Sequence, residues 1–153
     1  MKIAAIQKDV LTALMKNPKR VTVMECTGPD TVGICLDHSV GYIIPEEFMW
    51  LDEAKIESRI PFPVICPVSP DFENQLTMTG SLQEVSGRVL RRFEDAFGEP
   101  VWIENDRLKH FSDPSFYQQE PLGPVLVMET TNAEGEHRVG YILPTNKERL
   151  EEN

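Results

Sequence analysis

Apolar and polar residues recur along the N-terminal third of the chain at spacings that predict its secondary structure. The segment Met1–Ala5 has the composition of a short strand. The apolar face of Gln7–Lys16 predicts a helix that Pro18 ends, because proline disfavours helical backbone in the residue before it. The β-rich run Val21–Thr27 predicts a strand, and Val32–Ile44 predicts one long strand or a hairpin.

The C-terminal third repeats this order of elements. Pro100–Asn105 predicts a strand and Asp106–Phe111 a short helix, while Val125–Thr131 and Arg138–Leu143 predict a hairpin. In the middle of the chain, Arg59–Gln75 contains four prolines among apolar residues, which favours an extended connector or an edge segment over a central strand. These prolines are Pro61, Pro63, Pro67 and Pro70.

A further helix is predicted over Ser81–Phe97. Ser81 and Glu84 have the spacing of a capping box, and Gly98 stands where a helix commonly ends. Apolar residues recur at helical spacing in this segment, and arginines fall on the opposite arc. The apolar residues are Val85, Val89, Phe93 and Phe97, and the arginines are Arg88, Arg91 and Arg92.

Three stretches of the first third recur in the last third in the same order. The pairs are Ile6–Leu14 with Ile103–Phe111, Val21–Thr27 with Val125–Thr131, and Val40–Pro45 with Val139–Pro144, the last pair reading VGYIIP and VGYILP. This period is far longer than that of solenoid repeats and favours two half-domains.

The predicted fold class is therefore α+β, with internally duplicated β-α-β-β(-β) halves and a mainly antiparallel sheet with helices on one side. We expect a single domain over residues 1–153. Its half-repeats would lie at about 1–53 and 99–146, with a connector and an extra helix at 54–98.

Composition narrows the setting of the protein. The chain has 153 residues, a formal net charge of -10 at pH 7 and three cysteines without a CxxC pair. The odd cysteine number favours reduced thiols and a cytoplasmic location. Lys8 and Lys16 interrupt the first apolar residues, so we expect neither a signal peptide nor a membrane partner.

The cysteines and histidines suggest little chemistry. Cys35 and His38 could form a zinc site or a nucleophile pair, but strand alternation would place them on opposite faces, and paired zinc-ligand spacings are absent. His110 and His137 have no apparent partner in the sequence, and no common catalytic or nucleotide-binding motif occurs. We expect a non-enzymatic protein without a metal or cofactor. A small Cys/His enzyme is the less favoured alternative.

Cationic side chains are concentrated on the predicted helices, although the chain as a whole is acidic. One interpretation is a set of ordinary solvated helix faces. The other is a shared positive surface that follows a phosphate backbone without reading bases. The candidate nucleic-acid-binding residues are Lys8, Lys16, Lys19, Arg20, Arg88, Arg91, Arg92, Arg107 and Lys109.

The duplicated layout resembles one domain of the DNA sliding clamps, the polymerase processivity factors, over most of the chain outside residues 54–100. The resemblance implies helices that face duplex DNA with cationic side chains. Clamp subunits ordinarily contain two or three such domains and lack the predicted helix Ser81–Phe97. The resemblance therefore implies either a homo-oligomer that encircles DNA or a single-domain relative with another role.

The acidic segment after the first VGYIIP favours a different partner. It would bind a basic protein, or act as a DNA mimic toward a nucleic-acid-binding protein. The candidate partner-binding residues are Glu46, Glu47, Phe48, Trp50, Asp52 and Glu53. The apolar cluster Phe48–Trp50 is predicted to cap the core rather than to rest on a partner, because an exposed cluster needs a function.

Overall fold

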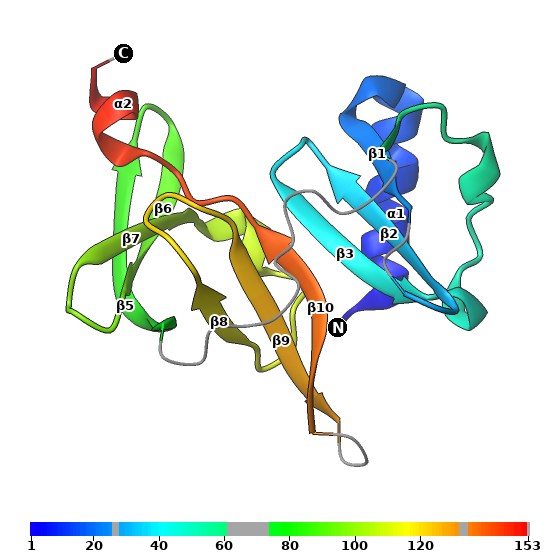
Figure 1. Ribbon diagram of the computed structural model, residues 1–153. Coiled ribbons are helices and arrows are strands. Elements are labelled where there is room, and N and C mark those ends of the chain that lie inside the picture. Colours follow the sequence, from blue (N-terminus) through cyan, green and yellow to red (C-terminus); the bar gives the residue numbers. More distant parts are fainter. Residues whose placement is uncertain (26–27, 61–73, 132–134, 153) are drawn as a thin grey trace.

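The computed structural model describes residues 1–25, 28–60, 74–131 and 135–152. Over these residues the protein is a mixed α+β structure with two α-helices and ten strands (Figure 1). The elements are α1 (Ile3–Lys16), β1 (Val21–Met24), β2 (Thr31–Leu36), β3 (Val40–Pro45), β4 (Arg59–Ile60), β5 (Gln75–Val85), β6 (Arg88–Glu94), β7 (Pro100–Glu104), β8 (Ser115–Gln118), β9 (Val125–Thr131), β10 (Gly135–Ile142) and α2 (Lys147–Glu151).

The strands form one sheet in the order β4-β1-β2-β3-β10-β9-β8-β5-β6-β7. Neighbouring strands are antiparallel except for the short parallel pair of β1 and β4. Two three-stranded meanders, β1-β2-β3 and β8-β9-β10, therefore lie on either side of the sheet centre.

The two VGYI[IL]P segments meet at that centre. In the pairing of β3 with β10, Gly41 lies opposite Tyr141 and Tyr42 lies opposite Gly140. The ring of Tyr141 lies where a side chain at position 41 would project, because a Cβ atom there would come within 2.1 Å of Tyr141 Cε1. The glycine of each segment thus faces the tyrosine of the other.

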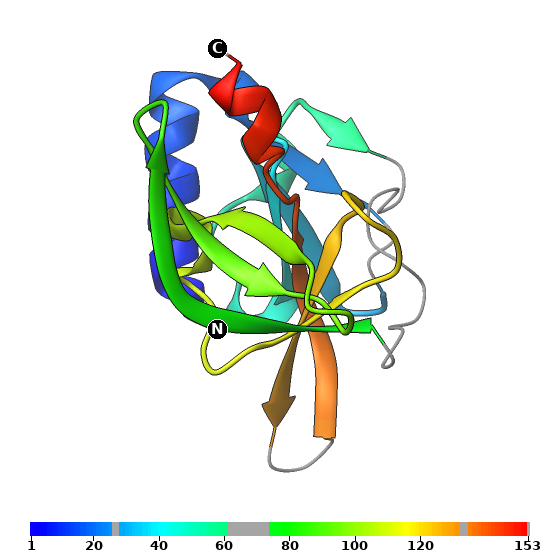
Figure 2. The same ribbon diagram turned by 90° about the vertical axis from the view of Figure 1, so that its left-hand side faces the viewer.

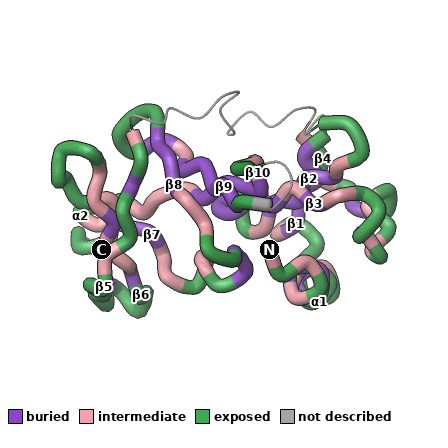
Figure 3. Tube along the Cα trace, turned by 90° about the horizontal axis from the view of Figure 1, so that it is seen from below, coloured by how far each residue is buried: buried purple, intermediate pink, exposed green. Residues whose placement is uncertain are grey.

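One core joins both meanders. Ile6, Val10 and Ala13 of α1 are buried in the same apolar cluster as Phe93 of β6 and Phe116 of β8. A second buried cluster is separate from this core and includes Tyr141 of β10. Buried residues are concentrated in the central strands, while α2 has no buried residue and most of the outer surface of α1 is exposed (Figure 3).

The C-terminal strands curl back on themselves. β5 is strongly bent (Figure 2), and its register with β6 shifts between Met78 and Leu82. The backbone N–H of Thr145, just beyond β10, donates to the carbonyl of Trp102 in β7 at 2.8 Å. β7 is therefore an edge strand in the ladder but contacts the chain that leaves β10.

The structure confirms several predicted elements. The strand beginning at Val21, the hairpin within Val32–Ile44, the strand at Pro100–Glu104 and the pairing of β9 with β10 are all present. Cys26, Thr27 and the four predicted connector prolines lie outside the described residues. Among the described residues, no helix is long and apolar enough to span a membrane.

The predicted strand at Met1–Ala5 is wrong, because α1 already begins at Ile3. Ile3, Ile6 and Val10 are spaced three and four residues apart, so the apolar stripe of the helix extends through the segment assigned to a strand. The helix ends as predicted before Pro18.

The predicted helix at Ser81–Phe97 is also wrong, because β5 and β6 form an antiparallel hairpin there. Ser86 and Gly87 close it with φ angles of 52° and 78°, and positive φ at both central residues is typical of the tight turns that match strand twist. Gly98 does have a positive φ, of 80°, but in the turn between β6 and β7.

The halves differ from the predicted β-α-β-β(-β) pattern. The first reads α1-β1-β2-β3, and the second has only the 3-10 helix Asn105–Leu108 where Asp106–Phe111 was predicted to be helical. The runs predicted to correspond, Val21–Thr27 and Val125–Thr131, contain strands at different places in their meanders. β1 is the first strand of its meander, and β9 is the middle strand of its own.

Candidate docking surface

Two aromatic side chains project from the segment between β3 and β4. We call residues 46–53 the acidic strip; it begins with the 3-10 helix Glu46–Phe48 and stops at the first residue of the 3-10 helix Glu53–Lys55. Phe48 is 55% exposed and Trp50 is 53% exposed. The predicted burial of this cluster is therefore wrong for both aromatics.

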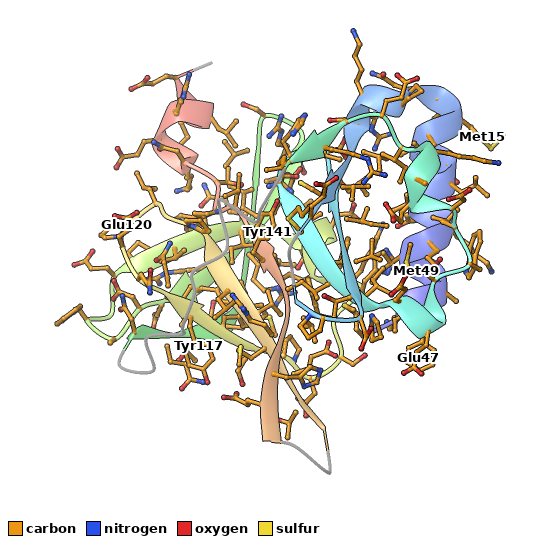
Figure 4. All side chains as sticks on the ribbon, turned by 45° about the vertical axis from the view of Figure 1, so that its right-hand side comes forward. Met15, Glu47, Met49, Tyr117, Glu120 and Tyr141 are labelled. Carbon is orange, nitrogen blue, oxygen red and sulfur yellow. The ribbon has the colours of Figure 1, made fainter. Side chains whose placement is uncertain are left out.

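The residues between them point inward. Met49 and Leu51 are partly buried and pack against the main core. The extended backbone after Phe48 alternates its side chains, so burying Met49 and Leu51 turns Trp50 outward. Figure 4 shows Glu47 and Met49 on this side of the molecule, next to α1.

Gln7 holds the acidic strip against α1. Its side chain is 0% exposed. Its amide Nε2 donates to the Phe48 carbonyl at 3.0 Å, and its Oε1 accepts from the backbone N–H groups of Trp50 at 2.9 Å and Leu51 at 3.1 Å. Three backbone groups of the strip are thus satisfied by one buried amide, so the two aromatics are presented by an ordered backbone.

Sequence reasoning did not find Gln7. It lies within the apolar arc of α1, beside Ile6 and Val10. A polar residue in the apolar arc of a helix is expected to be buried, and a buried polar side chain needs a hydrogen-bond partner. The position of Gln7 in this arc was therefore the sequence feature that could have identified it.

The acidic side chains of the strip have different roles. Asp52 accepts a hydrogen bond from the N–H of Ala54, and Glu53 pairs with Arg59 at 2.9 Å. Glu46 and Glu47 are exposed and make no ion pair with another described residue. Together with Asp30 and Pro45 they line a hollow of about 440 Å³. The unpaired negative charge therefore lies at the end of the strip that carries Phe48.

The predicted cations differ in their surroundings. Several of the nine are neutralised by carboxylates: Arg20 by Asp37 at 2.6 Å, Arg92 by Glu94 at 3.6 Å, Arg107 by Glu104 at 2.6 Å, and Lys109 by Asp9 and Asp106 at 3.4 and 3.5 Å. Arg91 donates to Asn105 and to the Thr79 carbonyl. Arg88, Arg91 and Arg92 lie on β6, not on a helix.

A cleft of about 490 Å³ brings three of these cations together with four carboxylates. The cations are Arg88, Arg107 and Lys109, and the carboxylates are Asp9, Asp37, Glu104 and Asp106. The guanidinium of Arg20 beside Asp37 lowers the pKa of that carboxyl by a direct hydrogen bond, so it stays charged. A cleft with this mixed charge does not favour an anion.

Asp9 joins α1 to the C-terminal half. Its Oδ2 lies 2.6 Å from Nε2 of His110, which is buried and stacks edge-on against Tyr42. Burial alone would raise the pKa of Asp9, but hydrogen bonds from His110 and Lys109 outweigh it, and the pKa is lowered from 3.8. His110 therefore has a partner that its sequence neighbours did not reveal.

Replacing Asp9 with asparagine is expected to lower the free energy of unfolding at pH 7 by about 1 kcal/mol, since the pair is partly solvated. A carboxyl whose pKa is lowered by folding stabilises above its unfolded value and loses this contribution as the pH falls through its folded value. The deficit should therefore shrink below pH 3.8. Urea unfolding at pH 7 and in acid measures it.

The matched control is Asp106→Asn, which removes a mostly exposed carboxylate beside the same lysine. This variant should change stability little at any pH. A deficit in Asp9→Asn that stays constant across the acid range would contradict the assigned ion pair.

Of the three cysteines, Cys35 lies within the residues that the structure describes, and its thiol is buried. Cys35 in β2 accepts a hydrogen bond from the Tyr141 hydroxyl at 2.9 Å, and burial raises the pKa of the thiol. His38 is exposed in the turn that follows. Cys26 and Cys66 lie outside the described residues, and within those residues no three His, Cys, Asp or Glu side chains form a group that could hold a metal ion.

The acidic strip thus exposes the aromatic side chains of Phe48 and Trp50 and the carboxylates of Glu46 and Glu47, which form no ion pair with a described residue. Its backbone is hydrogen-bonded to the buried Gln7. Comparison with protein-family models, with curated proteins and with solved structures finds no match.

Proposed function

We propose that the protein is a protein-interaction module whose acidic strip binds a basic segment with apolar anchors. The observation that carries this proposal is the exposure of Phe48 and Trp50 on a backbone that the buried Gln7 fixes. Exposed aromatics need a reason, and aromatic side chains dominate the binding energy of many interfaces.

Charge selects the partner in this proposal. Glu46 and Glu47 lie beside Phe48, and the whole chain carries a formal charge of -10. A field of this sign attracts cationic segments and repels acidic ones, and it accelerates their association at low salt. The partner is therefore a Lys- or Arg-containing segment with large apolar residues between the charges.

Replacing both Phe48 and Trp50 with alanine is expected to weaken binding of such peptides by about 10- to 100-fold without unfolding the protein, because hot-spot aromatics lose 2 kcal/mol or more on truncation. The probe is an array of short peptides that combine lysine or arginine with leucine or phenylalanine. The same peptides with glutamate in place of the cations provide the charge comparison. Calorimetry on the full chain then measures affinity.

Phe97→Ala is the matched control, since Phe97 is an 88% exposed aromatic in the turn between β6 and β7. It should leave binding unchanged. Glu46→Lys with Glu47→Lys should reduce the salt-dependent part of the affinity, whereas Glu84→Lys on β5 should not. Equal binding of cationic and glutamate peptides would remove the proposal.

Duplex DNA is the second candidate partner. Lys8, Lys16, Lys19 and Arg88 are exposed and make no ion pair in the part of the chain that the structure describes. They could contact phosphates without reading sequence. This candidate requires DNA retention that falls steeply with salt and is lost when Lys8 and Lys16 are both replaced by glutamate.

The proposed relation to a sliding-clamp domain rests on an internal duplication. The symmetric pairing of the two VGYI[IL]P segments and the meander on each side of them support it. The different positions of β1 and β9 in their meanders weigh against the full repeat alignment. A clamp-like role would also need several copies to associate, which sedimentation of the full chain tests.

A further inference from the structure

A second cleft, of about 780 Å³, lies on the opposite half of the molecule, beside β7 and α2. Figure 2 shows α2 above the β5–β6–β7 part of the sheet. The Ser86 hydroxyl at the β5–β6 turn donates to the carbonyl of Leu150, which holds α2 there. Pro100, Pro121, Leu122 and Pro144 contribute apolar surface to this cleft.

Trp102 forms the aromatic part of the cleft. It lies directly opposite Arg92 across the β6–β7 ladder, on the face of β7 away from Val101 and Ile103, which pack in the main core. Lys147 of α2 places its Nζ 4.9 Å from the centroid of the Trp102 ring and 3.1 Å from Glu151 Oε1. The cleft therefore already holds one alkylammonium group, supplied by its own chain.

The charge of the lining exceeds what this lysine neutralises. Four carboxylates line the cleft, against the two cations Arg92 and Lys147. The carboxylates are Asp95, Glu99, Glu148 and Glu151. Asp95 accepts from two backbone N–H groups of its turn. Glu99 and Glu148 make neither an ion pair nor a hydrogen bond through their side chains with any described residue.

Gln118 adds a neutral polar group to the lining of the cleft. Gln118 is 4% exposed and lines the cleft. Its Nε2 donates to the Gly123 carbonyl at 2.9 Å, but its amide oxygen accepts no hydrogen bond from a described residue. Among the described residues this oxygen is not a fully buried atom without a partner, so it is open to the solvent of the cleft and can accept from the N–H groups of a bound cationic side chain or backbone.

We infer that this cleft binds an extended peptide segment through one arginine or lysine side chain, which takes the place of Lys147 over Trp102. The carboxylates of Glu99 and Glu148 neutralise the incoming cation, and the prolines and Leu122 contact its apolar neighbours. Lys147 acts as an internal competitor. This inference does not depend on the acidic strip, which lies on the other half of the sheet.

The first test uses the Trp50→Phe chain, in which Trp102 is the single remaining tryptophan. The probe is an acetylated and amidated peptide in which one arginine is flanked by proline and leucine residues. Its control has citrulline, the neutral isostere, in place of arginine. We expect a saturable change in Trp102 fluorescence and about tenfold weaker binding of the citrulline peptide. Equal affinities, or no saturation at millimolar peptide, would overturn the inference.

The second test removes the competitor. Lys147→Met should tighten binding of the arginine peptide severalfold, because Trp102 and Glu151 are then free, while Glu99→Gln with Glu148→Gln should weaken it. An unchanged or weaker affinity in Lys147→Met, with α2 still helical by NMR, would contradict the assigned role. Spermidine is the free-cation probe. If it produces the same spectral shifts at the same concentration as the peptide, the peptide assignment is wrong.

The two docking proposals fail separately. Unchanged peptide affinity after Phe48 and Trp50 are replaced would overturn the acidic-strip proposal alone, because the Trp102 signal does not depend on those residues. Loss of the arginine preference in the Trp102 signal concerns the cleft alone.

Discussion

Replacing Gly140 with alanine is expected to lower the free energy of unfolding by about 4 kcal/mol or more, or to prevent folding. A Cβ atom at this position would lie 2.1 Å from the backbone oxygen of Gly41 and 3.3 Å from Phe111 Cε1. The first atom is part of the β3–β10 ladder and cannot rotate away. Relief would require the two central strands to separate, which would disrupt the pairing on which both meanders depend.

Gly41→Ala tests the same interface with a different obstacle. Its Cβ would meet the ring of Tyr141 at 2.1 Å, and that ring is fully buried. We expect a loss of about 3 kcal/mol. Because the obstacle is a side chain, Tyr141→Leu should relieve part of it, so the double variant should be less destabilised than the sum by about 1 to 2 kcal/mol. Gly140→Ala should show no such rescue.

Thermal and urea unfolding measure both effects, and Gly80→Ala supplies the control. Gly80 lies in β5, and a Cβ atom there would have nothing within 4 Å. This variant should remain within about 0.5 kcal/mol of the parent. If Gly140→Ala behaved like Gly80→Ala, the central pairing of the two VGYI[IL]P segments would be wrong.

Replacing Gln7 with leucine is expected to lower the free energy of unfolding by about 3 kcal/mol, because one carbonyl and two N–H groups of the acidic strip lose their partner. The residue is fully buried and its side chain spans the gap between α1 and the strip. Leucine fills a similar volume without donating or accepting, so the loss is one of hydrogen bonding more than of packing.

The same variant should also impair docking. With the backbone at Phe48 and Trp50 released, the aromatics lose their fixed position, and peptide affinity should fall by about tenfold even where the chain is folded. Increased amide exchange of Trp50 and Leu51 would report the released backbone. Gln83→Leu, at an exposed position in β5, is the control and should alter neither property.

Gln7→Glu separates the two hydrogen-bond roles. The carboxylate can still accept from Trp50 and Leu51 but cannot donate to the Phe48 carbonyl. We expect it to be at least as destabilising as leucine at pH 7, because it buries a charge, and less so in acid, where the protonated carboxyl can donate. Stability that is insensitive to both substitutions of Gln7 would show that Gln7 does not hold the strip.

The sequence predicted elements well where neighbouring residues decide the structure. Pro18 follows the end of the first helix, and Val32–Ile44 forms the hairpin of β2 and β3, one of its two predicted forms. The strands around Val125 and Val139 follow from β-branched residues between turn signals. In each case the controlling interactions lie within a few positions along the chain.

The segment Ser81–Phe97 shows where this reasoning failed. Val85, Val89 and Phe93 have the spacing of a helix face, yet Val89 is substantially exposed and the chain turns at Ser86. The spacing of four residues also places side chains on one face of a strand, so periodicity alone did not decide the type of element. Pairing of β5 with β8 and of β6 with β7 decided it.

The candidate sites depended still more on distant contacts. Phe48 and Trp50 were recognised as a possible partner surface, but their exposure depends on Gln7, about forty positions away in the chain. The candidate cations were chosen for their charge. In the structure, however, several of them form ion pairs with carboxylates from other elements, as Lys109 does with Asp9. Such ion pairs reduce the positive field that the sequence suggested.

By itself, the sequence determined where the first helix ends, that the runs around Val21, Val40, Val125 and Val139 become strands, that α1 has one apolar face, and that acid predominates. These properties follow from backbone preferences and from the spacing of neighbouring side chains. Only the tertiary structure decided that the two VGYI[IL]P segments pair with each other, that residues 81–97 become a hairpin, and which charged and aromatic groups stay unpaired. Strand pairing, burial and ion pairing join residues far apart in the chain, so their outcome depends on how the whole sheet closes around its core.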